Sequence, residues 1–531
     1  MHPALQISEI LRTIFRWCDK RSNVSNAVVC RSWQNDGLDL VWEEINDIQH
    51  IFKFLGPVAG NPRRFSPPLN YERWNLFRER YAWRVRKLID GGRVDSSHYP
   101  LLDTIARLQD HKPVFPNLKW LVWRSAIGRD DGYGHQSLIL MHPNVEKFEL
   151  SITQTDVPSE VLRQYIHAVS ERMPRLKNFH MTMPKSAFDG VAASLASLLK
   201  NLPELEFVSL PALSDPSHLL LALASRPRCM KYLDLTRDYK DLGAMQMTSL
   251  TRPSVLRDLQ HLSIAVSYQT FSHFIRECCD SLPRLTKLSV SSTSPHPEAP
   301  SALKDLLESV AGQLPLIKHL ELGFSREFPP DLAPSVTMAN IVHFLHIEPI
   351  LACTGITHFH IVHPYPLAVE HNELERIALA WPTLRSLTLS DDPKYPDVLL
   401  NDPGWPILDL GALLPFTRHC IYIEELHLCV KPVFSGDDQD VQPLRSLTRL
   451  SPGGQRCEGG YKEILDVAIF LSQLLPLRCK VEFESQWLSA ELRKKWDESW
   501  SEVMKGRLYI EELNRRKGEF KRWRQLSKVE G

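Results

Sequence analysis

The chain has 531 residues, too many for one ordinary globular core, so several domains or an array of repeats are expected. Hydrophobic residues make up 43% and charged residues 24%, which excludes a mostly disordered protein. Lys plus Arg and Asp plus Glu balance at 63 each, so no net charge draws the chain to nucleic acid or to an acidic membrane.

The sequence also bears on the compartment. Residues 1–10 lack the basic and apolar regions of a signal peptide, and no apolar stretch approaches the roughly 20 residues that span a bilayer. The ten cysteines form no C-x-x-C pair, and several lie in apolar runs, which favours buried free thiols in a reducing compartment. We therefore expect a cytoplasmic or nuclear protein with no membrane partner.

Residues 5–45 predict a small helical cluster. Ser8 is suited to cap a first helix that starts at Glu9 and carries an apolar stripe of Ile10, Leu11, Ile14 and Phe15. A second helix is expected over about residues 24–34 and a third around Leu40 and Trp42. About 40 residues form a marginal core, so this cluster would gain stability by docking on a partner or on the following domain.

Residues 49–114 predict a linker followed by an amphipathic helix. The Pro- and Arg-rich segment 61–68 indicates a turn. Residues 71–88 place apolar side chains at helical spacing, namely Trp74, Phe77, Tyr81, Val85 and Leu88, among six basic residues. Two interpretations fit: a surface for nucleic acid or an acidic partner, or a solvated helix packed on the first repeat.

One short pattern then recurs, Pro-x-Leu-x-x-Leu-x-Leu with conservative replacements. Eleven copies run from the one at Leu118, Leu121 and Trp123 to the one at Ile423, Leu426 and Leu428, and their first anchors lie 25 to 39 residues apart. The last two anchors of each copy are two residues apart, which predicts a strand with both on one face. A degenerate twelfth copy ends at Val481 and Phe483.

The segments between these strands have helical periodicity. Five of them predict helices, over residues 159–173, 189–199, 271–282, 302–314 and 374–380. Strand and helix in alternation predict an α/β fold in which stacked units bury a continuous core. The array over residues 115–485 resembles a leucine-rich-repeat solenoid, with parallel strands inside and helices outside. No asparagine lies three residues after the last anchor in any copy, unlike in many members of that family. A doubly wound open sheet is the alternative fold.

The helical cluster resembles an F-box. That family has the pattern Leu-Pro-x-Glu-Ile-Leu-x-x-Ile-Phe, then Val-Cys-[Arg/Lys]-x-Trp, then a further Trp; the matching residues here are Glu9, Ile10, Leu11, Ile14, Phe15, Val29, Cys30, Arg31, Trp33 and Trp42. Ser8 replaces the usual proline. The layout, F-box before repeats, is most similar to F-box proteins of mushroom-forming fungi.

The resemblance implies a partner and a docking surface. F-boxes bind the Skp-family adaptor and, through it, the cullin of a ubiquitin ligase. The adaptor-binding residues would be Ile10, Leu11, Ile14, Phe15, Val29, Cys30, Trp33 and Trp42. The alternative is that these helices only cap the repeat array.

Strand parity identifies candidate target-binding residues. Side chains that flank the second anchor of each copy point away from the core, onto a concave face. Six of these 22 positions are histidine, where composition alone gives about one, because the chain has 21 histidines in 531 residues. We select Trp120, Phe207, Tyr232, His261, His319, His358, His360 and His427 as a surface for an unknown target protein, with pH sensitivity near pH 6–7. A merely solvated sheet is the alternative, and residues 431–462 and the tail are rival sites.

Motifs for catalysis are missing from the sequence. It contains no phosphate-binding loop, H-E-x-x-H or G-x-S-x-G, and His358, His360 and His363 lack a carboxylate or cysteine at ligand spacing. We therefore expect no cofactor, no metal and no enzyme activity. The expected organisation is residues 1–48 for the F-box-like module, 49–114 for the linker and helix, 115–485 for the repeats and 486–531 for a charged helical tail.

Overall fold

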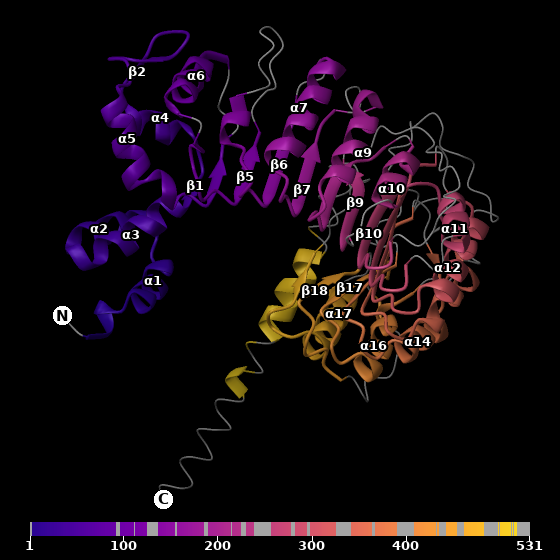
Figure 1. The fold of residues 1–531 in the computed structure, drawn as a ribbon. Coiled ribbons are helices and arrows are strands. Elements are labelled where there is room, and N and C mark those ends of the chain that lie inside the picture. Colours follow the sequence, from indigo (N-terminus) through magenta and orange to yellow (C-terminus); the bar gives the residue numbers. More distant parts are fainter. Residues whose placement is uncertain are drawn as a thin grey trace, which may run out of the picture. The chain divides into compact units, whose positions relative to one another are not determined.

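The computed structural model has α/β architecture (Figure 1). It describes most of the chain, in these ranges: 3–91, 96–110, 112–124, 136–153, 157–184, 189–213, 215–224, 230–237, 256–277, 282–294, 298–324, 341–363, 367–389, 408–431, 433–434, 442–453, 461–482, 498, 500–510, 512 and 515–517. Contacts divide the chain into two compact units, one of Met1–Leu242 with Met247–Leu259 and one of Gly243–Gln246 with Gln260–Gly531. Each unit is described by itself.

The first unit begins with three helices. They are α1 (Ser8–Arg16), α2 (Lys20–Val29) and α3 (Arg31–Glu43). Cys30 has extended backbone angles and separates α2 from α3, so the single helix expected over residues 24–34 is wrong. Ser8 is the first residue of α1 and caps nothing, because Ile7 is the N-cap residue and the Ser8 hydroxyl donates to the Asp36 carboxylate at 2.6 Å.

The segment after these helices contributes to the sheet. It forms α4 (Gln49–Leu55), α5 (Tyr71–Arg80) and α6 (Tyr99–Leu108), and the Pro- and Arg-rich turn joins a short hairpin of β2 (Val58–Ala59) and β3 (Arg64–Phe65). The helix expected over residues 71–88 ends at Arg80. Leu88 instead lies on strand β4 (Lys87–Ile89), which pairs with β1 (Glu44–Ile45) and with the first predicted strand.

The strands of the first unit are parallel and follow chain order. After β1 and β4 they are β5 (Trp120–Trp123), β6 (Lys147–Ser151), β7 (Asn178–Thr182), β8 (Phe207–Pro211) and β9 (Tyr232–Arg237). Helices α7 (Ser159–Arg172), α9 (Ala192–Asn201) and α10 (Ser217–Ala224) lie on one side of them (Figure 1). On α7, Leu162, Ile166 and Val169 form the buried stripe that packs on the sheet.

The second unit repeats this arrangement. Its strands are β10 (His261–Ala265), β11 (Lys287–Ser292), β12 (His319–Phe324), β14 (His358–Ile361), β16 (Ser386–Leu389), β17 (Glu425–Leu428), β18 (Arg449–Ser451) and β19 (Lys480–Val481). All of them pair in parallel and in chain order. Its helices are α11 (Tyr268–Glu277), α12 (Pro300–Gln313), α13 (Phe344–Ile347), α14 (His371–Ala380), α16 (Leu414–His419) and α17 (Tyr461–Leu474), with a small β13–β15 pair (Val342–His343 and Leu367–Ala368).

The strand order decides between the two folds considered. A doubly wound sheet reverses its strand order at a switch point, whereas here the strands of the main sheet follow one another in chain order in both units. The fold is therefore the leucine-rich-repeat-like α/β array, and the doubly wound alternative is wrong. All 33 anchor side chains of the eleven copies are buried. Of the twelfth copy, Val481 lies on β19, and Phe483 lies outside the described residues.

The described part of the tail packs on the second unit. Trp500, Val503 and Arg507 are buried, and the Arg507 guanidinium donates to the Pro476 carbonyl at 2.9 Å. These residues cover the last helix of the array, and the rest of the tail lies outside the described residues. Within the described ranges, no helix is long and apolar enough to cross a membrane. The cysteines in these ranges are free thiols, and three of them, Cys353, Cys420 and Cys479, are buried.

Candidate protein-interaction surfaces

The three N-terminal helices have a small apolar interior. Leu11 and Phe15 of α1 are 1% and 2% exposed, and the Phe15 ring meets the Trp33 ring of α3 edge-on, with centroids 5.4 Å apart. The Trp33 indole donates to the Leu5 carbonyl at 3.2 Å. Three of the residues predicted to bind an adaptor therefore form the interior of the module, where they support its surface from within.

Other apolar side chains of the module face solvent. On α1 and at its C-cap, Ile10, Ile14 and Trp17 follow one another at helical spacing on a side of the helix other than that of Leu11 and Phe15, and Trp17 is 88% exposed. On α2 and at its end, Val24, Val28 and Val29 are exposed, and the exposed fraction of Val28 is 81%. We call these six residues the apolar stripes. The sequence prediction included Ile10, Ile14 and Val29 and missed Trp17, Val24 and Val28, although their spacing along each helix was readable.

Polar contacts fix the helices and tie them to the segment that precedes the repeats. Asp36 of α3 accepts from the Arg12 guanidinium of α1 at 3.0 Å in addition to the Ser8 hydroxyl. Asp39 pairs with Arg12 and with the buried Arg84, which also donates to the Asn35 side chain at 2.9 Å. Charge-assisted bonds of this kind hold the backbone of α1 and α3 in one geometry.

Two further predicted adaptor residues are structural. The Trp42 ring packs among aromatic rings of the next segment, 4.8 Å from Tyr81, 5.1 Å from Phe54 and 6.0 Å from Phe77 between centroids. It therefore joins the module to the repeats. Cys30 is the joint between α2 and α3, and a contact with the Ser32 hydroxyl at 3.1 Å lowers the pKa of its thiol.

The sheet presents a second surface on the face opposite the buried anchors, which we call the open face. In the first unit, the Trp120 ring lies between two ammonium groups, with Lys87 Nζ 4.0 Å and Lys147 Nζ 3.6 Å from its centroid. Lys147 also pairs with Glu149 at 3.0 Å. Trp120 is thus covered on both sides by cations rather than open to a partner.

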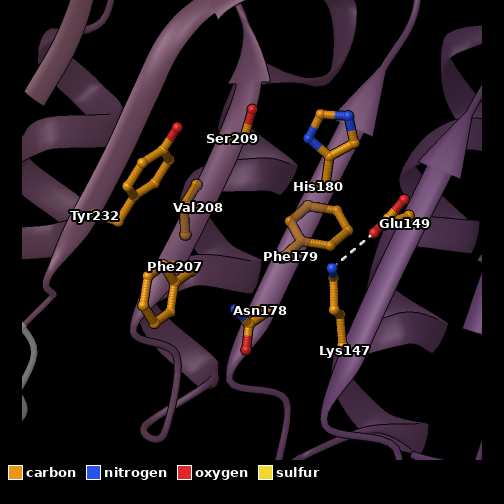
Figure 2. Close-up of a pocket in the computed structure, with 9 residues that line it drawn as sticks. All are labelled: Lys147, Glu149, Asn178, Phe179, His180, Phe207, Val208, Ser209 and Tyr232. Atoms are coloured by element: carbon orange, nitrogen blue, oxygen red, sulfur yellow. Dashed lines mark ion pairs between the residues drawn. The ribbon is translucent and has the colours of Figure 1, made fainter. Parts of the chain in front are cut away.

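A hollow of about 280 Å³ lies beside it on the open face (Figure 2). The Phe207 ring, 39% exposed, and the Tyr232 ring come from neighbouring strands, with centroids 5.8 Å apart. Figure 2 shows them on one side, with Asn178, His180, Lys147 and Glu149 of the two preceding strands on the other. The lining is Lys147, Glu149, Asn178, Phe179, His180, Phe207, Val208, Ser209 and Tyr232. The predicted Phe207 and Tyr232 are brought together here, and Trp120 is not in the lining.

Five predicted histidines lie on the open face of the second unit. His319 and His358 are partners on adjacent strands, and their rings stack with centroids 3.9 Å apart. His360 contacts the Thr388 hydroxyl at 2.8 Å, and His427 is the next residue in that row. His261, on β10, contacts the Ser263 hydroxyl at 2.8 Å. The histidines therefore form two rows across the strands.

The pH range expected for these histidines needs correction. Partial burial, together with the neighbouring positive charges of His358 and Lys287, lowers the pKa of His319 to about 4. Burial also lowers the pKa of His358 and of His360. These three rings titrate below the ordinary range of histidine, so the sensitivity expected near pH 6–7 is wrong for them. In the described ranges, no three His, Cys, Asp or Glu side chains are placed to share a metal ion.

These features define a class: an α/β repeat protein of leucine-rich-repeat-like architecture, preceded by a three-helix module with exposed apolar stripes. A scan against protein-family models finds no match, and a search of curated proteins finds none either. Two solved structures are similar to this chain, each at 14% sequence identity. One is from the Rad7–Elc1 complex of yeast, with a TM-score of 0.36 over 84% of this chain and 97% of that chain. The other is an internalin of Listeria monocytogenes, with a TM-score of 0.33 over 73% and 95%.

Proposed function

We propose that this protein is a non-catalytic substrate-recognition subunit of an SCF-type cullin–RING ubiquitin ligase. In this proposal, the N-terminal module docks a Skp-family adaptor and the repeats hold a target protein. The resemblance of residues 8–42 to an F-box suggests the partner. The apolar stripes are the observation that carries the proposal.

The exposure of the apolar stripes has a free-energy cost that a binding partner would remove. Each apolar side chain left in water forgoes about 1.5–3 kcal/mol that full burial would supply. Six of them lie within residues 10–29, whereas the anchors of the repeats are all buried. Several exposed apolar side chains on a small module are typical of a protein-binding site. The ion pairs of Arg12 with Asp36 and Asp39 hold α1, which presents Ile10 and Ile14, against α3.

The test uses substitutions in the stripes. Leu11→Asp is unsuitable because Leu11 is interior, and the charge would unfold the module. Ile14→Asp with Val28→Asp places charges where water already reaches. We expect this double variant to lose affinity for a purified Skp-family adaptor by at least about a hundredfold, while the protein stays folded.

Leu477→Asp is the matched control, because Leu477 is an exposed apolar residue, 79% accessible, in the second unit. It should leave adaptor binding unchanged. Undiminished binding by the stripe variant, or no binding by the unmodified chain, would contradict the proposed adaptor role.

For target recognition we propose the open face, beginning with the hollow at Phe207 and Tyr232. Exposed aromatic rings in a hollow are frequent energetic centres of protein interfaces. Replacing both by Ala should abolish labelling of target proteins in a proximity-labelling experiment. Trp120→Ala should have a smaller effect because two lysines already cover the ring. Tyr422→Ala, an exposed tyrosine outside the open face, is the control.

A second candidate is a repeat scaffold without a ubiquitin-ligase role, in which the N-terminal helices only cap the array. The contacts of Trp42 and Arg84 favour it, because they fasten α3 to the segment that leads into the repeats. A cap has no reason to expose the apolar stripes. Binding of the adaptor by the unmodified chain therefore separates the two candidates.

A further inference from the structure

One part of the open face of the second unit carries lysine and histidine side chains from adjacent strands. Lys287, His319 and His358 are register partners on β11, β12 and β14. Their neighbours along each strand, Leu288, Leu320 and Phe359, are buried anchors, so all three side chains project onto the open face. Lys318, the residue before β12, is exposed, and it is near enough for its positive charge to lower the pKa of His319. Adjacent strands are about 4.8 Å apart, so these groups form one cluster.

The cluster is short of anionic partners within the described chain. Within the described residues, the ammonium groups of Lys287 and Lys318 form no ion pair, and the ring nitrogens of His319 form no hydrogen bond. Elsewhere on the open face charges are matched, as in Lys87 with Glu44 at 2.9 Å and Lys147 with Glu149 at 3.0 Å. Strong donors without acceptors on a partly buried face point to a ligand that supplies the acceptors.

The charges around His319 come from several strands. They are Lys287 on β11, Lys318 and Glu321 on its own chain segment, His358 and His360 on β14, Arg385 beside β16, and Glu424 and Glu425 at β17. Arg385 and Glu424 pair at 2.9 Å, and Glu425 is engaged by Arg449 at 3.5 Å and by the Ser386 hydroxyl at 3.0 Å. Each charged group that shifts the pKa of His319 lowers it. At neutral pH the positive charge beside His319 comes from Lys287 and Lys318, because the pKa of His358 and of His360 is lowered.

The geometry also limits the kind of anion. A nucleic acid would bring a continuous row of phosphates across Glu321 and Glu425, which would repel it, and the whole chain has no net positive charge. A peptide can place a few carboxylates against the cations and leave the glutamates free. Such a carboxylate would also stabilise the protonated form of His319.

We propose that the open face of β11, β12 and β14 binds an acidic segment of the target protein, with Lys287, Lys318 and His319 holding its carboxylates and His358 positioning the His319 ring. The inference rests on the proposed function in that the repeats bind a protein target, and it names the chemistry of that target. Binding takes up a proton at His319.

The experiment measures fluorescence anisotropy of a short labelled polyglutamate peptide on the full chain. Lys287→Gln and His319→Gln should each weaken binding by about tenfold, the effect of losing one charge-assisted hydrogen bond. Lys304→Gln, which removes a cation from helix α12 on the other side of the sheet, should leave binding unchanged. Circular dichroism checks that each variant is folded.

The pH dependence distinguishes His319 from a passive neighbour. Affinity of the unmodified chain should rise as the pH falls from about 6.5 toward about 5, because proton uptake acts between the pKa of His319 in the complex and its pKa of about 4 in the free chain, and His319→Gln should remove most of that rise. Equal binding of a polylysine peptide, tighter binding of a single-stranded oligonucleotide, or unchanged binding by Lys287→Gln would each overturn the proposal. The assay contains no adaptor, so its failure is distinct from failure of adaptor docking.

Discussion

Gly37 sets how closely helices α2 and α3 approach. A Cβ atom at Gly37 would lie 2.9 Å from the Ala27 Cβ and 2.9 Å from its backbone nitrogen, and neither can move without shifting a helix. Gly37→Ala should therefore destabilise the module by about 1–3 kcal/mol, despite the higher helix propensity of alanine. Urea unfolding, followed by protease cleavage within the module, measures the change.

Gly312 provides the matched control. It lies in helix α12, and a Cβ there would meet nothing within 4 Å. Gly312→Ala should stabilise its unit by up to about 1 kcal/mol, because only the propensity term acts. Equal effects of the two substitutions would show that the close approach of α2 and α3 is not what Gly37 provides.

His319 makes stability depend on pH. Its pKa is about 4 in the folded chain against 6.5 ordinarily, so the unfolded chain binds the proton first as the pH falls. The contribution is fully present above pH 6.5 and is lost as the pH falls toward 4. We expect the urea midpoint of the second unit to fall over this window and His319→Gln to flatten the fall. His167→Gln, on the solvent side of α7, should keep the slope of the unmodified chain.

Within one strand, the loss of stability on substitution differs between the two faces. Leu320 of β12 is an anchor with no exposed surface, whereas its neighbour Glu321 is exposed on the open face. Leu320→Ala should destabilise the second unit by about 2–5 kcal/mol through lost burial and the cavity left behind. Glu321→Ala should change stability by less than about 0.5 kcal/mol. Similar midpoints for the two variants in denaturant unfolding would contradict the assignment of faces.

The elements of the array were predictable where a two-residue spacing recurred. All eleven predicted strands lie at their predicted anchors, because parity allows only one register when one face is buried. Strand β4 was missed because Val85, Leu88 and Asp90 place a buried aspartate at the third anchor, where it accepts from the Arg124 amide at 2.7 Å. β18 was missed because Pro452 occupies the same place after Leu447 and Leu450.

The candidate surfaces were predictable only in part. The alternation of side chains along each strand predicts that Phe207 and Tyr232 share one face. It does not predict that lysines of two other strands cover the Trp120 ring. On α1 both sides of the helix are apolar, so the sequence could not decide which would be buried. The burial of Leu11 and the exposure of Ile14 follow from how α1 packs on α3, a tertiary contact.

For the whole molecule, order in sequence equals order in space within each unit. Every described strand pair is parallel except the β2–β3 hairpin, and each strand of the main array pairs with the ones before and after it. Stability in such arrays is close to a sum of repeat terms and nearest-neighbour terms. A destabilising substitution in one repeat should therefore lower the stability of the adjacent repeats more than that of distant repeats.

Amide hydrogen exchange can test this locality with one substitution in each unit. Phe148 of β6 and Leu320 of β12 are both fully buried anchors, and each strand is paired on both sides. Phe148→Ala should lower protection in β5 to β8, and Leu320→Ala in β11 to β16, with the other unit nearly unchanged in each case. Matching losses in both units from either substitution would mean that the chain unfolds as a single cooperative body. If each substitution lowers protection only in its own unit, the helical module and the acidic-segment site can be altered independently.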